Sequence, residues 1–173
     1  PQEGLPVART SHASQHGSAG VLEGDVHVGH SVIGDGLERV ALERLAREQD
    51  LSSQVEFLGQ LPRESVLKAM ADCDVFSLPS WQEGFGIVYL EAMACGKVVL
   101  TGAETEFVSH YDLDREVAVN VQPDVDQIYG QMTRLVEQPE LIRAIGNNAR
   151  EFVVSHHHYI KIAQRYLECW NSN

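Results

Sequence analysis

The sequence of 173 residues is long enough for one globular domain with its own hydrophobic core. Apolar residues make up 43% of it and charged residues 22%, which excludes a disordered or fibrous chain. Lys and Arg total 13 against 25 Asp and Glu, and the formal charge of −12 argues against nucleic acid or an anionic membrane surface as a partner.

Cysteine usage and hydropathy predict a cytoplasmic protein. Cys73, Cys95 and Cys169 are widely spaced and form no CxxC pair, so neither a disulfide framework nor a structural zinc site is expected. No apolar run approaches the roughly 20 residues that span a membrane. The N-terminus shows no signal-peptide pattern. We therefore expect no integral membrane span.

The N-terminal segment 1–24 is rich in Ser, Gly, His and Pro and lacks apolar periodicity. This predicts an irregular leader or the remnant of a domain boundary, followed by one folded domain over 25–173. The first strand is predicted over 26–33, with a bulge or weak pairing where Gly29, His30 and Ser31 interrupt the apolar run.

Gly34-Asp35-Gly36 predicts a tight turn into an amphipathic helix over 37–49. The apolar stripe of that helix consists of Leu37, Val40, Ala41 and Leu45. Its charged residues are expected to face solvent, namely Glu38, Arg39, Glu43, Arg44 and Arg47.

From residue 55 onward, short apolar strands alternate with helices of about ten residues. The predicted strands are 55–58, 74–79, 98–101 and 117–121. The predicted helices are 63–72, 86–95, 124–137, 140–152 and 159–170. This alternation predicts an α/β fold, with a parallel sheet covered by helices on both faces.

The stretch SWQEGFGIVYLEAMACG at 80–96 is the most informative part of the sequence. It follows a buried strand, and parallel sheets bind ligands beyond the carboxyl ends of their strands. The N-terminus of the next helix offers free N–H groups that favour an anion. Glycines on both sides of Phe85 allow the backbone to approach a ligand closely. We therefore expect a ligand at this loop.

Glu83 and Glu91 are the carboxylates of this stretch. Glu91 is the one charged side chain in an otherwise apolar helix, and a buried carboxylate needs hydrogen-bond donors such as ligand hydroxyls. An equally good alternative places Glu91 at a helix edge facing water, or in an ion pair. Glu83 taken alone is more often an ordinary loop residue.

The segment ADCDVFSLPSWQEGFGIVYLEAMACG at 71–96 closely resembles the donor-binding signature of the retaining GT-B glycosyltransferases called glycosyl transferases group 1. Flanking segments agree with that family, namely GDGLER, VEFLGQLPRESVL and RYLECW. The resemblance covers roughly residues 32–171. It implies a Rossmann-like domain, the C-terminal half of a GT-B fold, which binds a nucleotide-diphosphate sugar without a metal or other cofactor.

The resemblance also implies roles for individual residues. Glu83 matches the catalytic-site glutamate, which contacts the donor sugar near the reacting carbon. Gly84, Phe85 and Gly86 match the backbone amides that face the sugar and phosphate. Glu91 matches the carboxylate that binds the ribose hydroxyls.

Further matches lie outside this stretch. Gly34 and Gly36 match the tight turn beside the donor cleft. Phe57 and Leu58 lie in the segment that contacts the base, largely through backbone groups, and Glu106 fits an acid in a later family loop.

The family chemistry is transfer of a sugar with retained anomeric configuration, and the leaving diphosphate is stabilised by helix N–H groups and basic side chains. In the family a separate N-terminal domain binds the acceptor, and 173 residues leave no room for both domains. The expected function is therefore that of the donor-binding domain of a hexosyltransferase-type enzyme. A separate acceptor-domain chain, or a homo-oligomer, would complete it.

Departures from the family pattern keep a second hypothesis open. The strand that usually carries an Arg and a Lys for the diphosphate is absent, and Arg9 is the only cation before Arg39. Lys97 replaces the usual proline, and the loop 102–106 lacks one glycine and a proline. The alternative is a non-catalytic module that binds and regulates a full-length transferase. Weak nucleotide binding with tight protein association would favour it.

A run of histidines, His156-His157-His158, invites a metal-site interpretation. Neighbouring residues on a helix point about 100° apart and share one ion poorly, so solvated histidines are expected instead. His12, His16, His27 and His30 lie in a region without carboxylate or cysteine partners, so we expect no metal there either.

Overall fold

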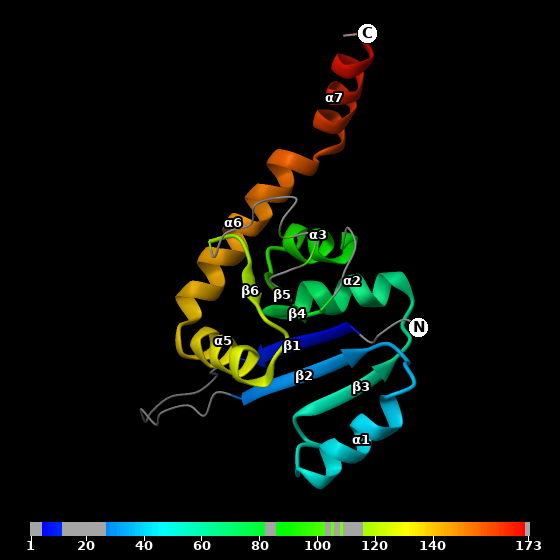
Figure 1. Cartoon of the computed structure of the whole chain (residues 1–173), viewed down its shortest axis with the longest axis vertical. Helices are drawn as coiled ribbons and strands as arrows, with labels where there is room; N and C mark the ends of the chain where they lie inside the picture. Colours follow the sequence, from blue (N-terminus) through cyan, green and yellow to red (C-terminus); the bar gives the residue numbers. More distant parts are fainter. Residues whose placement is uncertain are drawn as a thin grey trace, which may run out of the picture. The chain divides into compact units, whose positions relative to one another are not determined.

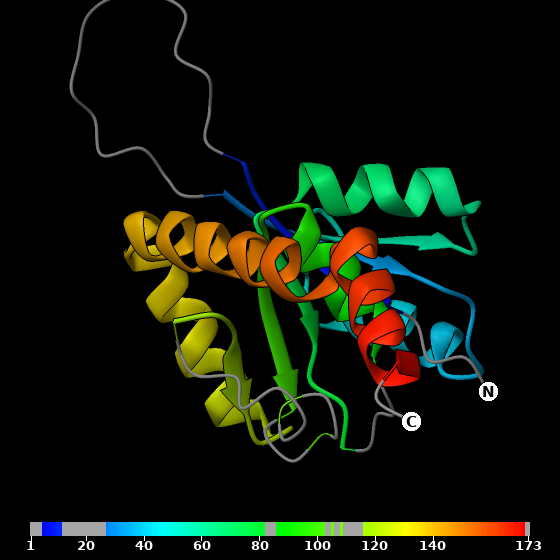
Figure 2. The same ribbon diagram turned by 90° about the horizontal axis from the view of Figure 1, so that it is seen from above.

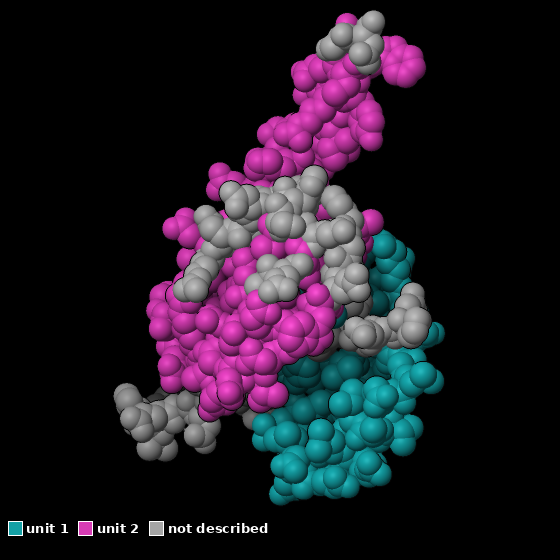
Figure 3. All heavy atoms as spheres, in the orientation of Figure 1, with its two compact units in different colours: residues 1–78 teal, residues 79–173 magenta. Residues whose placement is uncertain are grey.

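The computed structural model describes residues 5–11, 27–81, 86–102, 105, 108 and 116–171. The chain forms two compact units, residues 1–78 and 79–173 (Figure 3). Within the described ranges, no helix combines the length and the apolar character that crossing a membrane requires.

The described part of unit 1 contains four strands, which are adjacent in the order β3-β2-β1-β4. Two helices lie on opposite sides of these strands, α1 (Arg39–Glu48) and α2 (Arg63–Asp72) (Figures 1 and 2). β2 and β3 pair in parallel, whereas β1 is antiparallel to both β2 and β4. The strands are β1 (Leu5–Ser11), β2 (His27–Ile33), β3 (Val55–Gly59) and β4 (Val75–Leu78).

The prediction of an irregular leader is wrong over residues 5–11, which form β1. This strand pairs with β2 along its whole length, from Leu5 opposite Ile33 to Ser11 opposite His27. Backbone pairing requires no apolar alternation, so composition gave no sign of it. The rest of the predicted leader, residues 1–4 and 12–24, lies outside the described residues.

The interruption of β2 predicted at Gly29, His30 and Ser31 is wrong, since all three residues pair with β1 without a shift of register. His30 and Ser31 pair regularly with β3, and the register shifts between Val32 and Ile33. The shift comes directly before Gly34, whose φ of 131° lies in a region that favours glycine. The strand therefore ends in a sharp change of direction.

The predicted orientation of α1 is wrong. Leu37 is 95% exposed and Val40 is 74% exposed, although both belong to the predicted apolar stripe. The less exposed residues are Arg39, Glu43 and Ala46, which share one face at spacings of four and three. A polar face of α1 is therefore turned away from solvent, because Arg39 bonds to β3.

The core of unit 1 lies around β4, all four residues of which are buried as the apolar run predicts. α2 has the bounds that the sequence predicts, residues 63–72. The buried apolar residues of the unit are Ile33, Ala46, Ala69, Met70, Cys73, Val75, Phe76 and Leu78.

Unit 2 contains two parallel strands, β5 (Val98–Gly102) and β6 (Val119–Val121). The α/β fold class predicted from the sequence is confirmed, with the antiparallel β1 of unit 1 as the departure from a parallel sheet. The described helices of unit 2 are α3 (Ile87–Ala94), α5 (Val125–Glu137), α6 (Pro139–His157) and α7 (Tyr159–Asn171).

Close packing of α3 against α6 organises the core of unit 2. Gly146 of α6 lies against the backbone of Gly96, so closely that a Cβ at Gly146 would overlap the Gly96 carbonyl. Arg150 Nη1 donates to the Ala94 carbonyl oxygen at 2.8 Å and so binds the last turn of α3. The largest fully buried side chains here are Tyr89, Met93, Val98, Val99, Leu100, Leu135 and Ile145.

α7 differs from the other helices of unit 2 because none of its residues is buried. It extends away from α3, α5 and the two strands of the unit (Figure 1). Its exposed large side chains are Tyr159, Ile160, Tyr166, Leu167 and Trp170.

Candidate functional site

The carboxyl ends of β2 and β3 meet in a pair of glycine turns. The Gly34 N–H donates to the Gly59 carbonyl oxygen at 2.8 Å. Gly59 has a φ of 67°, so both turns use backbone that L side chains rarely adopt. Parallel sheets bind ligands at this end of their strands. Gly34 thus lies where the sequence predicts a turn.

The Arg39 side chain fills the space beside these turns. Its Nε donates to Glu43 Oε1 at 2.8 Å, and its Nη2 donates to the Phe57 carbonyl oxygen at 3.3 Å. Its Nη1 lies 3.5 Å from Asp35 Oδ1. The bond to Glu43 is the main cause that raises the pKa of Arg39 above its ordinary value. The side chain stays a cation whose charge two carboxylates offset.

The sequence pattern placed Arg39 on the solvent-facing side of the helix, so its contact with β3 was not predicted. Gly36 accepts from the Arg39 backbone N–H at 3.1 Å, while Phe57 and Leu58 are half-buried in β3. Unit 1 thus brings together Gly34, Gly36, Phe57 and Leu58 at one end of two parallel strands.

In unit 2, Gly86 begins α3 in the left-handed conformation, with φ 61° and ψ 48°. A Cβ at this position would overlap the ring of Tyr89, a residue that is fully buried. The Tyr89 N–H also donates to the Gly86 carbonyl oxygen at 2.9 Å. Only glycine fits here without rearrangement, which agrees with its place in the predicted loop.

Glu91 is half-buried on α3, beside the fully buried Ala92 and Met93. The helix is less enclosed than its apolar sequence predicts, since Ile87 is 65% exposed. Glu91 is therefore neither sealed in the core nor on the open surface.

Two loops of unit 2 meet at the carboxyl end of β5. The Ser80 carbonyl lies so close to Gly102 that any side chain there would overlap it. Thr105 is buried, and its Oγ1 donates to the Gly102 carbonyl oxygen at 3.0 Å. The segments that lead to Glu83 and to Glu106 thus begin next to each other. Glu83, Gly84, Phe85 and Glu106 themselves lie outside the described residues.

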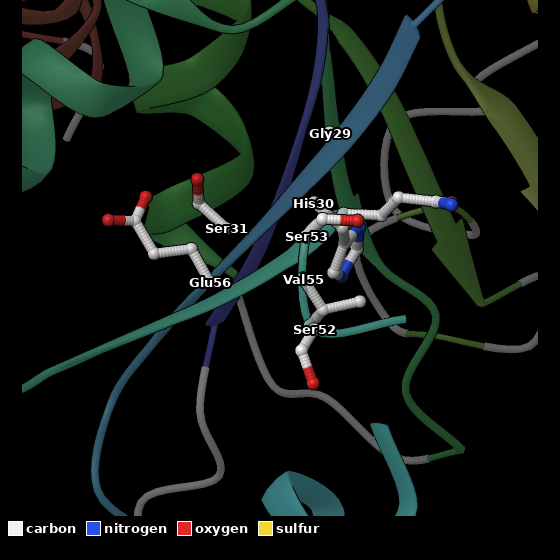
Figure 4. A pocket seen from close by; sticks show the side chains of 8 residues that line it. Gly29, His30, Ser31, Ser52, Ser53, Val55 and Glu56 are labelled. Atoms are coloured by element: carbon white, nitrogen blue, oxygen red, sulfur yellow. The ribbon is translucent and has the colours of Figure 1, made fainter. Parts of the chain in front are cut away.

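A hollow of about 270 Å³ lies at the opposite, amino ends of β2 and β3. Its side chains diverge, with Ser31 and Glu56 on one side of the strands and His30 and Val55 on the other (Figure 4). Burial lowers the pKa of His30, which favours the neutral imidazole. Among the predicted donor-binding residues that the structure describes, none lines this hollow, which is bordered by Gly29, His30, Ser31, Ser52, Ser53, Gln54, Val55 and Glu56.

The C-terminal histidines contact aromatic neighbours, and His157 shares Phe152 with His156, its ring centroid lying 6.1 Å from that of Phe152. His156 stacks on Phe152 with ring centroids 4.5 Å apart, and His158 stacks on Tyr159 at 4.8 Å. Over the ranges that the structure describes, no group of three or more His, Cys, Asp or Glu is arranged to hold a metal ion.

Comparison with known proteins identifies the family. The sequence profile of the family described as "Glycosyl transferases group 1" matches residues 27–152. The chain belongs to that family. Its relatives include the N-acetyl-alpha-D-glucosaminyl L-malate synthase of Bacillus anthracis, which is 32% identical over 78% of this chain and 35% of its own length.

Two further proteins are similar to this member of the glycosyl transferases group 1 family. The GDP-mannose-dependent monoacylated alpha-(1-6)-phosphatidylinositol monomannoside mannosyltransferase of Corynebacterium glutamicum is 32% identical, over 70% of this chain and 33% of its own length. The crystal structure of Anabaena Alr3699/HepE in complex with UDP has the same fold, with a TM-score of 0.70 and 24% identity over 83% of this chain and 40% of that one. The chain thus spans about a third of the length of the curated relatives it matches.

Proposed function

We propose that this chain binds a nucleotide-diphosphate sugar as the donor-binding domain of a retaining glycosyltransferase. The observation that carries the proposal is the signature from Glu83 to Glu91 within the family match at 27–152. Support comes from the local geometry around it, since Gly86 has left-handed backbone, which favours glycine, and Glu91 is half-buried.

The chemistry of each group fits such a donor. Glu83 would accept hydrogen bonds from sugar hydroxyls near the reacting carbon, and Glu91 would accept them from the ribose. The N–H groups at the start of α3 would face the diphosphate and stabilise the charge that develops as it leaves. Gly34 and Gly36 would form the tight turn beside the donor cleft, and Phe57 and Leu58 would lie in the segment that contacts the base. The proposal includes no metal or other cofactor.

Acceptor binding is assigned to another domain, carried by the same polypeptide, by a separate chain or by a second copy of this one. The supporting fact is that the curated relatives are about three times as long as the matched region. A cytoplasmic location belongs to the same proposal, supported by three cysteines that form no disulfide, Cys73, Cys95 and Cys169. Retention would be tested by assigning the anomeric configuration of the product of the complete enzyme by NMR.

A thermal-shift series with UDP-, GDP- and ADP-sugars tests the donor site. A ligand present at about 100 times its Kd stabilises the folded state by roughly 2.7 kcal/mol, which raises Tm measurably. One class of nucleotide should raise the Tm of the wild-type chain, and Glu91→Ala should abolish that shift. Glu151→Ala, at an exposed glutamate of α6, is the matched control and should leave the shift intact.

The opposite results are equally informative. If no nucleotide sugar shifts the Tm of a folded wild-type chain, the donor-site proposal is wrong. Tight binding of such a chain to a full-length transferase would then establish the alternative, a non-catalytic module. A shift that survives Glu91→Ala would remove Glu91 from the proposed site.

A further inference from the structure

The face of α1 that contacts β3 is charged, which reverses the pattern expected of an amphipathic helix. The Arg39 and Glu43 side chains are 30% and 31% exposed, whereas the apolar Leu37 and Val40 point to solvent. Natural proteins break such local rules mainly at functional sites. The inverted pattern therefore indicates that Arg39 has a role at the end of β3.

All three guanidinium nitrogens of Arg39 are engaged. Nε binds Glu43, Nη1 lies by Asp35, and Nη2 binds the Phe57 carbonyl oxygen. Two carboxylates offset its charge, so it is poorly suited to hold a phosphate. The two carboxylates instead fix the orientation of the planar guanidinium group, which donates a hydrogen bond to a backbone carbonyl of β3.

Arg39 also fits against the bare backbone at Gly59. A Cβ at that glycine would lie 2.7 Å from Arg39 Nη1, so the guanidinium occupies the space that a side chain would take. The Gly59 carbonyl accepts from the Gly34 N–H, and the Gly36 carbonyl accepts from the Arg39 N–H. One side chain thus joins both turns and the end of β3.

We propose that Arg39 is a positioning residue that fixes the backbone of Phe57–Gly59 and so sets the discrimination between nucleotide bases. The inference rests on the proposed function, in which this segment contacts the base. Backbone groups discriminate between bases only while their peptide planes hold one orientation. A lysine at this position, with a single ammonium group, does not reproduce a planar fork that reaches three partners.

Isothermal titration of the 173-residue chain with UDP, GDP and ADP tests this role. The quantity compared is the ratio of the Kd values for the preferred nucleotide and the next best. Arg39→Ala and Arg39→Lys should each reduce this ratio roughly tenfold, because the lost bond is charge-assisted. Arg44→Ala is the matched control, since Arg44 forms an exposed pair with Glu48 on the same helix at 3.6 Å and should leave the ratio unchanged.

Hydrogen exchange gives a second measurement that needs no ligand. The Gly34 amide, which donates to Gly59, should exchange faster in both Arg39 variants than in Arg44→Ala. If Arg39→Ala does not fold, Arg39→Lys and Glu43→Gln carry the test. Glu43→Gln keeps the guanidinium but weakens its orientation, so it should reduce the ratio by a smaller factor.

The outcomes separate this inference from the function on which it rests. A wild-type chain that binds none of the three nucleotides overturns the proposed function and, with it, the role of Arg39. A wild-type chain that binds one of them, with Arg39 variants that keep the full ratio, overturns the Arg39 inference alone. Equal weakening for all three nucleotides also overturns it, since that result indicates only structural support.

Discussion

Two glycines of unit 2 show how strongly a single residue depends on its surroundings. Gly86 begins α3 with a φ of 61° and leaves no room for a Cβ beside Tyr89. Gly130 lies within α5, where a Cβ would meet nothing within 4 Å. The same substitution should therefore have opposite effects at the two positions.

Gly86→Ala should lower the free energy of unfolding by at least about 2 kcal/mol, because left-handed backbone and overlap with a buried ring add together. Gly130→Ala should raise it by roughly 0.5–1 kcal/mol through helix propensity. Urea unfolding of both variants measures this. If Gly130→Ala lowers the free energy of unfolding as much as Gly86→Ala does, the left-handed backbone of Gly86 is not the cause of the destabilisation.

His30 gives a prediction for pH dependence. Burial lowers its pKa in the folded state below the ordinary value of 6.5, so the unfolded chain binds the proton more tightly. Stability should therefore be complete above about pH 6.5 and fall as the pH drops below that value, until the folded-state pKa is passed. Urea unfolding at about pH 7.5 and pH 5.5 should show a smaller loss in His30→Gln than in the wild type. An equal loss of stability in the wild type and in His30→Gln would assign that loss to carboxylates.

At the level of elements, the sequence predicts most of the fold and part of the candidate site. α2 and the buried β4 follow directly from apolar periodicity and from Pro62 before the helix. The turn at Gly34 follows from glycine chemistry. These features depend on residues that are neighbours in the sequence, so a single sequence is enough to predict them.

The features that the sequence did not predict depend on distant partners. β1 is held by backbone pairing with β2 and β4, which leaves no mark on composition. The orientation of α1 is set by Arg39 reaching Phe57, 18 residues away. Such contacts override local propensity, and one sequence taken alone does not reveal them.

Packing between α3 and α6 gives a prediction at this scale. Gly146→Ala should destabilise the chain by roughly 1–3 kcal/mol, because a Cβ would push α6 from the Gly96 backbone and disturb the helix that carries Glu91. Asn147→Ala, at an exposed neighbouring position, should change stability by less than about 0.5 kcal/mol. Thermal unfolding of the two variants checks this. Equal Tm values for Gly146→Ala and Asn147→Ala would mean that α6 moves to accept the new Cβ without loss of stability.

At the level of the whole molecule, α7 contributes little to the stability of the chain described here. None of its 13 residues is buried, and isolated helices of that length are marginal in water. A chain ending at His158 should therefore keep its Tm within about 2 °C. For comparison, Ile145→Ala, at a position 2% exposed, should cost roughly 2–5 kcal/mol. A large Tm loss on truncation would show that α7 packs against something in solution.

The place of β3 in unit 1 has a consequence for self-association. Among the described strands it is the last in the order β3-β2-β1-β4, with a neighbouring strand on one side only. A strand edge of this kind is a template for aggregation, and proteins protect such edges with short strands and with charged side chains. β3 has only five residues, and Arg39 occupies one of its carbonyls while Glu56 adds an exposed charge. The residue that orients this backbone therefore also makes it a poor template for amyloid-like growth.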